Sequence, residues 1–225
     1  MEKLMRKQFT KELENIKKRI LALGALAEER VQMALKAIDT NDSDLADKII
    51  KSDYEIDEME VEIEEECLKV LALHQPVAID LRFIVAVIKI NAELERIGDQ
   101  AVNIAERVGV TAKREQLDFY FDYATMGEKA QAMLKMSLDA FIHLDYDVAF
   151  KVVLMDDEVD KIKDEAYDQI KKAISENPDK TGYLINLFLI SRHLERLADH
   201  TTNIAEQVVY LVEGDIIRHA PYTQE

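Results

Sequence analysis

The sequence is poor in the residues that build disulfide-linked or turn-rich proteins. Its 225 residues include one Cys, three Pro, six Gly and no Trp. The single cysteine, Cys67, cannot form an intramolecular disulfide, which favours a reducing compartment, so we expect a cytoplasmic protein. So few Gly and Pro argue against a β-rich fold, because such a fold needs a turn roughly every ten residues.

Positive charge and long hydrophobic runs are also scarce. The 29 Lys and Arg residues are outnumbered by 45 Asp and Glu residues, and the formal net charge is −16. A chain this acidic is a poor candidate for nucleic-acid binding, because phosphate contacts need clustered cations. The longest apolar runs, 83–88 and 183–190, are shorter than the roughly 18 residues that a membrane span requires. We therefore expect no transmembrane segment, and membrane association at most through partners.

An internal repeat is the most informative feature of the sequence. Residues 94–106 and 194–206 are identical at eight of thirteen positions, with an offset of 100. An upstream block, 33–57, recurs at 136–160 with an offset of 103. The chain is therefore a duplication of one unit.

Each copy is predicted to form three helices, because apolar residues recur at helical spacing and no segment alternates long enough for a strand. Pro76 is expected at the start of the third helix, where proline is tolerated. The fold class is all-α: six long helices as two tandem three-helix bundles, residues 1–110 and 111–225, related by a pseudo-two-fold axis or a simple tandem arrangement. A short charged linker, 109–117, suggests that the bundles pack together. The expected helices are 4–39, 44–73, 76–108, 118–143, 147–175 and 180–213.

Acidic residues recur one helical turn apart along the third helix of each copy. On a helical wheel four polar residues share the face away from the apolar residues, and Arg96 stands beside this stripe; the four are Glu95, Asp99, Asn103 and Glu106. The second copy repeats the stripe, and the second helix of each copy adds a further acidic pair. An ordinary solvated face is the simplest explanation. Against it, like charges one turn apart repel each other, yet this spacing occurs four times. The repeated residues are Glu195, Asp199, Asn203 and Glu206, and the added pairs are Asp53 with Asp57 and Asp156 with Asp160.

Oxygen-rich stripes on neighbouring helices suit a hard cation such as Mg²⁺, Ca²⁺, Mn²⁺ or oxidised iron, and carboxylate-bound zinc is a further candidate. The expected site is shallow and partly exposed. A di-iron oxidase is disfavoured, because its Glu-x-x-His pairs are missing from the sequence. Only His200, next to Asp199, stands where a histidine could join the metal ligands.

The sequence resembles the PhoU family of phosphate-transport accessory proteins, which repress the phosphate-starvation response. The resemblance rests on the doubled block Leu-Glu-Arg-x-x-Asp-x-x-x-Asn-Ile-Ala-Glu and on Gln-Pro-Val-Ala-Ile-Asp-Leu-Arg at 75–82, and it covers nearly the whole chain. It implies a non-enzymatic regulator of phosphate uptake. Its implied partners are the sensor histidine kinase and the ATPase subunit of the phosphate ABC transporter, and a homodimer is also expected.

The resemblance also implies transition-metal sites, as multinuclear iron or zinc clusters. Gln100 departs from the family, which often has a histidine there, so the two sites are expected to differ. A metal-binding carboxylate protein without a role in phosphate signalling is the alternative function. Carried over to this sequence, the implied ligands are Asp53, Asp57, Glu95, Asp99 and Asn103 in the first copy, and Asp156, Asp160, Glu195, Asp199 and Asn203 in the second.

Overall fold

The computed structural model describes residues 2–115, 117, 119 and 121–215, with side chains from Arg6 onward. These residues form seven α-helices and one short 3₁₀ helix, and they contain no β-strand, which confirms the all-α prediction. No helix in these ranges is both long and apolar enough to cross a membrane. The helices are α1 (Glu2–Thr40), α2 (Ser43–Lys51), α3 (Tyr54–His74), α4 (Ala78–Thr111), α5 (Tyr123–His143), α6 (Tyr146–Glu176), η1 (Pro178–Lys180) and α7 (Thr181–Glu213).

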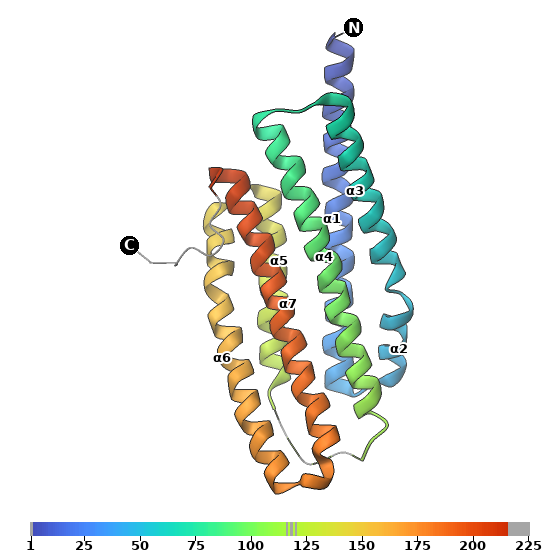
Figure 1. The fold of residues 1–225 in the computed structure, drawn as a ribbon, viewed down its shortest axis with the longest axis vertical. Coiled ribbons are helices and arrows are strands. Elements are labelled where there is room, and N and C mark those ends of the chain that lie inside the picture. The colour runs from blue at the N-terminus through green and yellow to red at the C-terminus, as the bar shows by residue number, and fades with distance from the viewer. Residues whose placement is uncertain (1, 116, 118, 120, 216–225) are drawn as a thin grey trace, which may run out of the picture.

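The helices run along the long axis of an elongated bundle (Figure 1). At its centre α4 and α7 lie side by side in opposite directions, and α1 and α5 pack against them. The remaining helices lie at the outer edges, α2 and α3 on one side and α6 on the other. A continuous apolar core joins all of them, so the prediction that the two copies pack together is confirmed.

The second helix of the first copy is broken, contrary to the prediction of one helix over 44–73. The backbone N–H of Ser52 donates to the carbonyl oxygens of both Lys48 and Ile49, and its hydroxyl also donates to Ile49. This tight turn ends α2, because a serine side chain competes for backbone acceptors. Met155 occupies the corresponding position in the second copy, and there α6 continues without interruption.

Other predicted boundaries were wrong by two to five residues. Helix α4 begins at Ala78, not at Pro76, because Gln75 adopts a left-handed conformation that ends α3 and Val77 is extended. It continues to Thr111, beyond the predicted 108. Helix α5 begins at Tyr123 rather than 118, where the Asp122 carboxylate caps the new helix by accepting from the N–H of Thr125. The tail 216–225, assigned to the second bundle, lies outside the described residues.

The two halves are related by a pseudo-two-fold axis. Where α1 crosses α5, Gly24 faces the side chain of Leu138, and Gly127 faces that of Leu35. The offset of 103 converts the first pair into the second with the helices exchanged. A simple tandem repeat could not produce such reciprocal contacts, since reciprocity requires a two-fold relation.

The contacts between α4 and α7 have the same reciprocity. Glu93 of α4 binds His200 of α7, and Gln100 of α4 binds His193 of α7. An offset of 100 converts one pair into the other. The axis therefore passes between the middles of the two central helices.

Candidate functional site

The predicted acidic residues of the first copy form one cluster between α3 and α4. Asp53 precedes α3 by one residue, and it is half-buried. Burial raises the pKa of its carboxyl group, and the charges of Asp57 and Asp99 raise it further. Because Asp99 belongs to α4, the structure brings the two predicted motifs together. We call this group the first carboxylate cluster: Asp53, Asp57, Glu95 and Asp99.

The two carboxyl groups that α4 contributes to this cluster, those of Glu95 and Asp99, also have raised pKa values. Burial raises the pKa of Glu95, with added repulsion from Asp99, Asp57 and Glu60. Burial and the charge of Asp57 likewise raise the pKa of Asp99. Each carboxylate thus holds its proton more tightly than a free one, which is the electrostatic state that a bound cation would relieve.

The second copy has the same arrangement between α6 and α7. Burial, together with the charges of Asp199 and Asp160, raises the pKa of Asp156 to about 6. Burial, Glu195 and Asp160 raise the pKa of Asp199 to about 6 as well. We call this group the second carboxylate cluster: Asp156, Asp160, Glu195 and Asp199.

A position beside each cluster carries opposite charge in the two copies. The ammonium group of Lys163 lies 3.4 Å from Glu195 and 3.9 Å from Asp160, inside the second cluster. The offset of 103 places Glu60 at the corresponding position of the first copy. Glu60 accepts a hydrogen bond from the buried Asn91, and its charge adds to the repulsion on Glu95. The second cluster therefore contains an ammonium group at this position, whereas the first has a further carboxylate there.

The chemistry of the donors fits a hard cation, but the donors are not assembled around one. Within the described ranges, no group of three or more His, Cys, Asp or Glu side chains lies close enough together to hold a metal ion. Side chains would have to rotate to form a coordination sphere. Metal binding at the ten predicted residues accordingly stays a prediction.

The two predicted amide ligands, Asn103 and Asn203, and the arginine beside the stripe, Arg96, are not members of either cluster. The Asn203 amide donates to Glu93 across the interface at 3.1 Å, instead of lying with the second cluster. The guanidinium of Arg96 donates to Glu93 at 2.7 Å and does not orient a stripe carboxylate. Asn103 is half-buried on α4, one turn beyond Asp99.

The prediction that the whole stripe faces away from the core is wrong at its end. Glu206 is only 9% exposed, since α7 is covered there by its neighbours. Its counterpart Glu106 is exposed and forms an ion pair with Arg107 at 3.0 Å. The two copies therefore use the same residue type in different environments.

A polar network in the α4–α7 interface was not predicted from the sequence. Glu93, 9% exposed, binds Nδ1 of His200 at 2.8 Å. Burial disfavours its ionised form, but the hydrogen bonds from His200 and Asn203 hold its pKa below the usual range. Seven residues along α4, Gln100 binds Nδ1 of His193 at 3.0 Å. The spacing of seven, repeated in both copies, was the signal that could have predicted this pairing.

The geometry defines a class of protein: an internally duplicated, all-helical molecule with one carboxylate cluster between the outer and central helices of each half. Residues 20–108 and 123–208 match the PhoU domain. The chain belongs to the PhoU family, as the sequence resemblance predicted.

Individual relatives match over nearly their whole length. A phosphate-specific transport system accessory protein PhoU homolog from Pseudomonas aeruginosa is 38% identical over 96% of this chain and 90% of its own length. A homolog of the same description from Clostridium acetobutylicum is 35% identical over 94% of this chain and 97% of its own length. The crystal structure of PhoU from Pseudomonas aeruginosa matches with a TM-score of 0.89 at 37% identity, covering 92% of this chain and 100% of that one.

Proposed function

We propose that this chain is an accessory protein of phosphate transport that represses the phosphate-starvation response by binding other proteins. The observation that carries the proposal is the match of both halves to the PhoU domain, with relatives described as accessory proteins of the phosphate-specific transport system. The proposed partners are the ATPase subunit of the phosphate transporter and the sensor histidine kinase, both reached from the cytoplasm.

Binding, not catalysis, is the proposed mode of action. The net charge of −16 supports association with basic protein surfaces. Such association is faster at low salt, because electrostatic steering decays over a Debye length of about 8 Å at physiological ionic strength. The alternative of a metal-binding protein without a signalling role gains no support from the described residues. The expected homodimer is tested by light scattering of the purified chain.

Deletion of the gene tests the function directly. In phosphate-replete medium, we expect the deletion strain to produce alkaline phosphatase that the parent strain represses, and a plasmid copy to restore repression. A deletion strain that keeps alkaline phosphatase repressed would show that the chain is not a negative regulator. Cross-linking in cells, with the transporter ATPase and the kinase carrying affinity tags, identifies the partners independently.

A further inference from the structure

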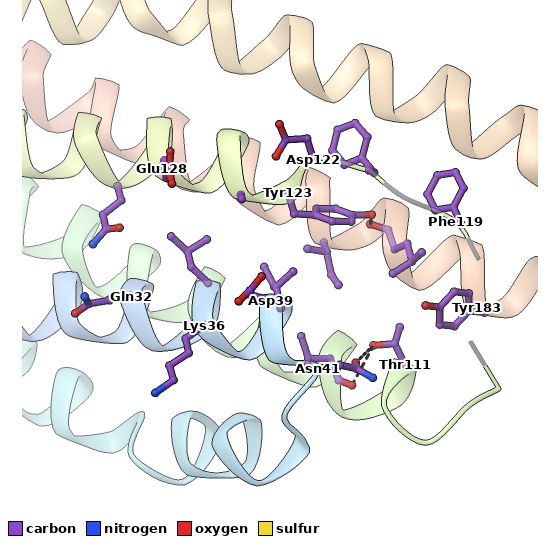
Figure 2. A pocket seen from close by; sticks show the side chains of 18 residues that line it. Gln32, Lys36, Asp39, Asn41, Thr111, Phe119, Asp122, Tyr123, Glu128 and Tyr183 are labelled. Carbon is purple, nitrogen blue, oxygen red and sulfur yellow. Dashed lines mark hydrogen bonds between the residues drawn. The ribbon is translucent and has the colours of Figure 1, made fainter. Parts of the chain in front are cut away.

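A cavity of about 640 Å³ lies at one end of the interface between the two halves. It is bounded by the end of α1 and the starts of α5 and α7, with Phe119, Phe121 and Asp122 along one side (Figure 2). Both halves of the duplication contribute to its walls. Its volume falls within the range of ligand pockets, roughly 300–1,000 Å³.

The inner wall of this cavity is aromatic and apolar. The aromatic rings of Phe119, Tyr123 and Tyr183 all line the cavity, and they lie on the same side of the view in Figure 2. The hydroxyl of Tyr123 donates to the backbone carbonyl of Leu187 at 2.8 Å, so its only polar atom is already satisfied. Burial raises the pKa of Tyr123, and the hydroxyl therefore stays neutral. Such a wall suits an apolar side chain.

The rim of the cavity is acidic. Among the described residues that line it, carboxylates come from Asp39, Asp122 and Glu128, and one ammonium group comes from Lys36. In Figure 2 the side chain of Asp39 points toward α5, whereas that of Lys36 points away from it. All three carboxylates are exposed. A ligand that enters the cavity must therefore move past negatively charged side chains.

The corresponding place at the other end of the interface is filled. There Phe83 and Phe141 stack with their ring centroids 6.2 Å apart, and Phe141 is 1% exposed. Under the offsets of 100 and 103 their counterparts are Tyr183 and Ile38, which both line the cavity. Ile38, which borders the cavity, has a smaller side chain than its counterpart Phe141.

We propose that this cavity is the docking site for a basic segment of a partner protein, which inserts an aromatic or branched aliphatic side chain beside Lys or Arg. Charge complementarity selects this occupant: the apolar side chain meets the aromatic wall, and the cations meet the carboxylates of Asp39, Asp122 and Glu128. The inference rests on the proposed function, because it takes the partner from the phosphate transporter or its sensor kinase.

The test uses the full-length chain and overlapping synthetic peptides of about 15 residues. The peptides cover the cytoplasmic regions of the transporter and the kinase from the same organism, and binding is measured by fluorescence polarisation at low and moderate salt. Ile38→Phe fills the cavity with the residue used at the opposite end. Val61→Phe, at an exposed position of α3, is the matched control. Asp39→Asn with Glu128→Gln removes rim charge without touching the core, and Glu58→Gln with Glu65→Gln removes equal charge from the exposed face of α3.

We expect a basic, apolar peptide to bind the native chain and Ile38→Phe to weaken it about tenfold or more. The double rim variant should weaken binding several-fold at low salt and reduce its salt dependence, while both controls bind normally. The proposal is wrong if no peptide binds, if the filled cavity binds as the native chain does, or if the rim and control variants behave alike. It is also wrong if Ile38→Phe changes only the oligomeric state, because the occupant would then be a second copy of the chain.

A parallel experiment in cells separates this proposal from the proposed function. If gene deletion releases alkaline phosphatase while the Ile38→Phe chain still represses it, the function holds and the cavity proposal fails. If deletion has no effect, the function fails whatever the peptides show.

Discussion

The two carboxylate clusters belong to matching segments of the two copies, yet they differ in the charge beside them and in the continuity of the helix that carries them. In the second half Lys163 lies among the acids, and α6 passes through the site as an unbroken helix. In the first half Glu60 takes that position, and the chain breaks at Ser52, directly beside Asp53. Duplication thus preserved the acids but not their surroundings. The two halves therefore differ in electrostatics and in whether the helix beside the acids is continuous.

The two ends of the interface between the halves also differ, in how completely their side chains fill the space. One is filled by the stacked rings of Phe83 and Phe141, and the other is left open between Ile38 and Tyr183. A two-fold axis makes the ends equivalent in backbone arrangement. Side-chain size then makes one a packed core and the other a cavity.

The largest expected effect is a loss of stability at the filled end of the interface, which should be much smaller at the open end. Phe141→Ala should lower the free energy of unfolding by about 3–5 kcal/mol, because it removes a fully buried ring and leaves a void. Ile38→Ala should cost only about 1 kcal/mol, since Ile38 is half-buried and already borders open space. Urea unfolding followed by circular dichroism measures both values. Equal losses would mean that the two ends are packed alike.

The reciprocal contacts of α4 and α7 are expected to differ as well. Glu93→Ala should cost about 2 kcal/mol, because it leaves the half-buried side chains of His200 and Asn203 without their acceptor. Gln100→Ala breaks the neutral contact with His193 and should cost about 1 kcal/mol. Both are measured by urea unfolding at pH 7. If Gln100→Ala proves the more damaging change, the charged contact is not the stronger one.

Metal titration would sharpen the comparison of the two clusters. We predict that Mn²⁺ binds the first cluster about tenfold more tightly than the second, because Lys163 repels a cation there. Calorimetry on Asp156→Asn/Asp160→Asn isolates the first cluster, and calorimetry on Asp53→Asn/Asp57→Asn isolates the second.

The matched exchange variants are Glu60→Lys and Lys163→Glu. The first should weaken binding at the first cluster, and the second should strengthen binding at the second cluster. Equal affinities would remove the distinction between the clusters. The absence of binding with Mn²⁺, iron and Zn²⁺ alike would show that the metal prediction itself is wrong.

The smallest effect is the pH dependence of the second cluster. Asp156 has a pKa of about 6 in the folded chain, above its unfolded value, so the folded state binds this proton more tightly. Its contribution to stability is therefore fully present below about pH 4 and is lost as the pH rises through about 6. Asp156→Asn should stabilise the chain by about 1 kcal/mol at pH 7, after allowance for solvent screening, and by almost nothing at pH 4.

Urea unfolding at the two pH values, in EDTA to remove metal, checks this difference. Asp168→Asn is the matched control, because Asp168 is exposed on the same helix and is not among the charges that raise the pKa of Asp156. A stabilisation by Asp156→Asn that is the same at pH 4 and pH 7 would contradict the raised pKa.

Helical class and duplication could be predicted because both are local properties of the sequence. The apolar spacing along residues 9–27 predicts a helix whatever it packs against, and the matched blocks at 94–106 and 194–206 show the repeat directly. The grouping of Asp53 with Asp99 was predicted only through the family resemblance. The break at Ser52 was missed, because a single serine is compatible with both a continuous helix and a turn.

The sequence by itself determined the helices, their duplication and which residue types each copy repeats. Only the tertiary structure decided that the copies meet about a two-fold axis, that Glu93 meets His200, and that Ile38 borders a cavity where Phe141 fills a core. The physical reason is that helical periodicity acts within a few turns of one chain segment. Contacts between helices about a hundred residues apart depend on which faces pack and on how completely their side chains fill the space between them.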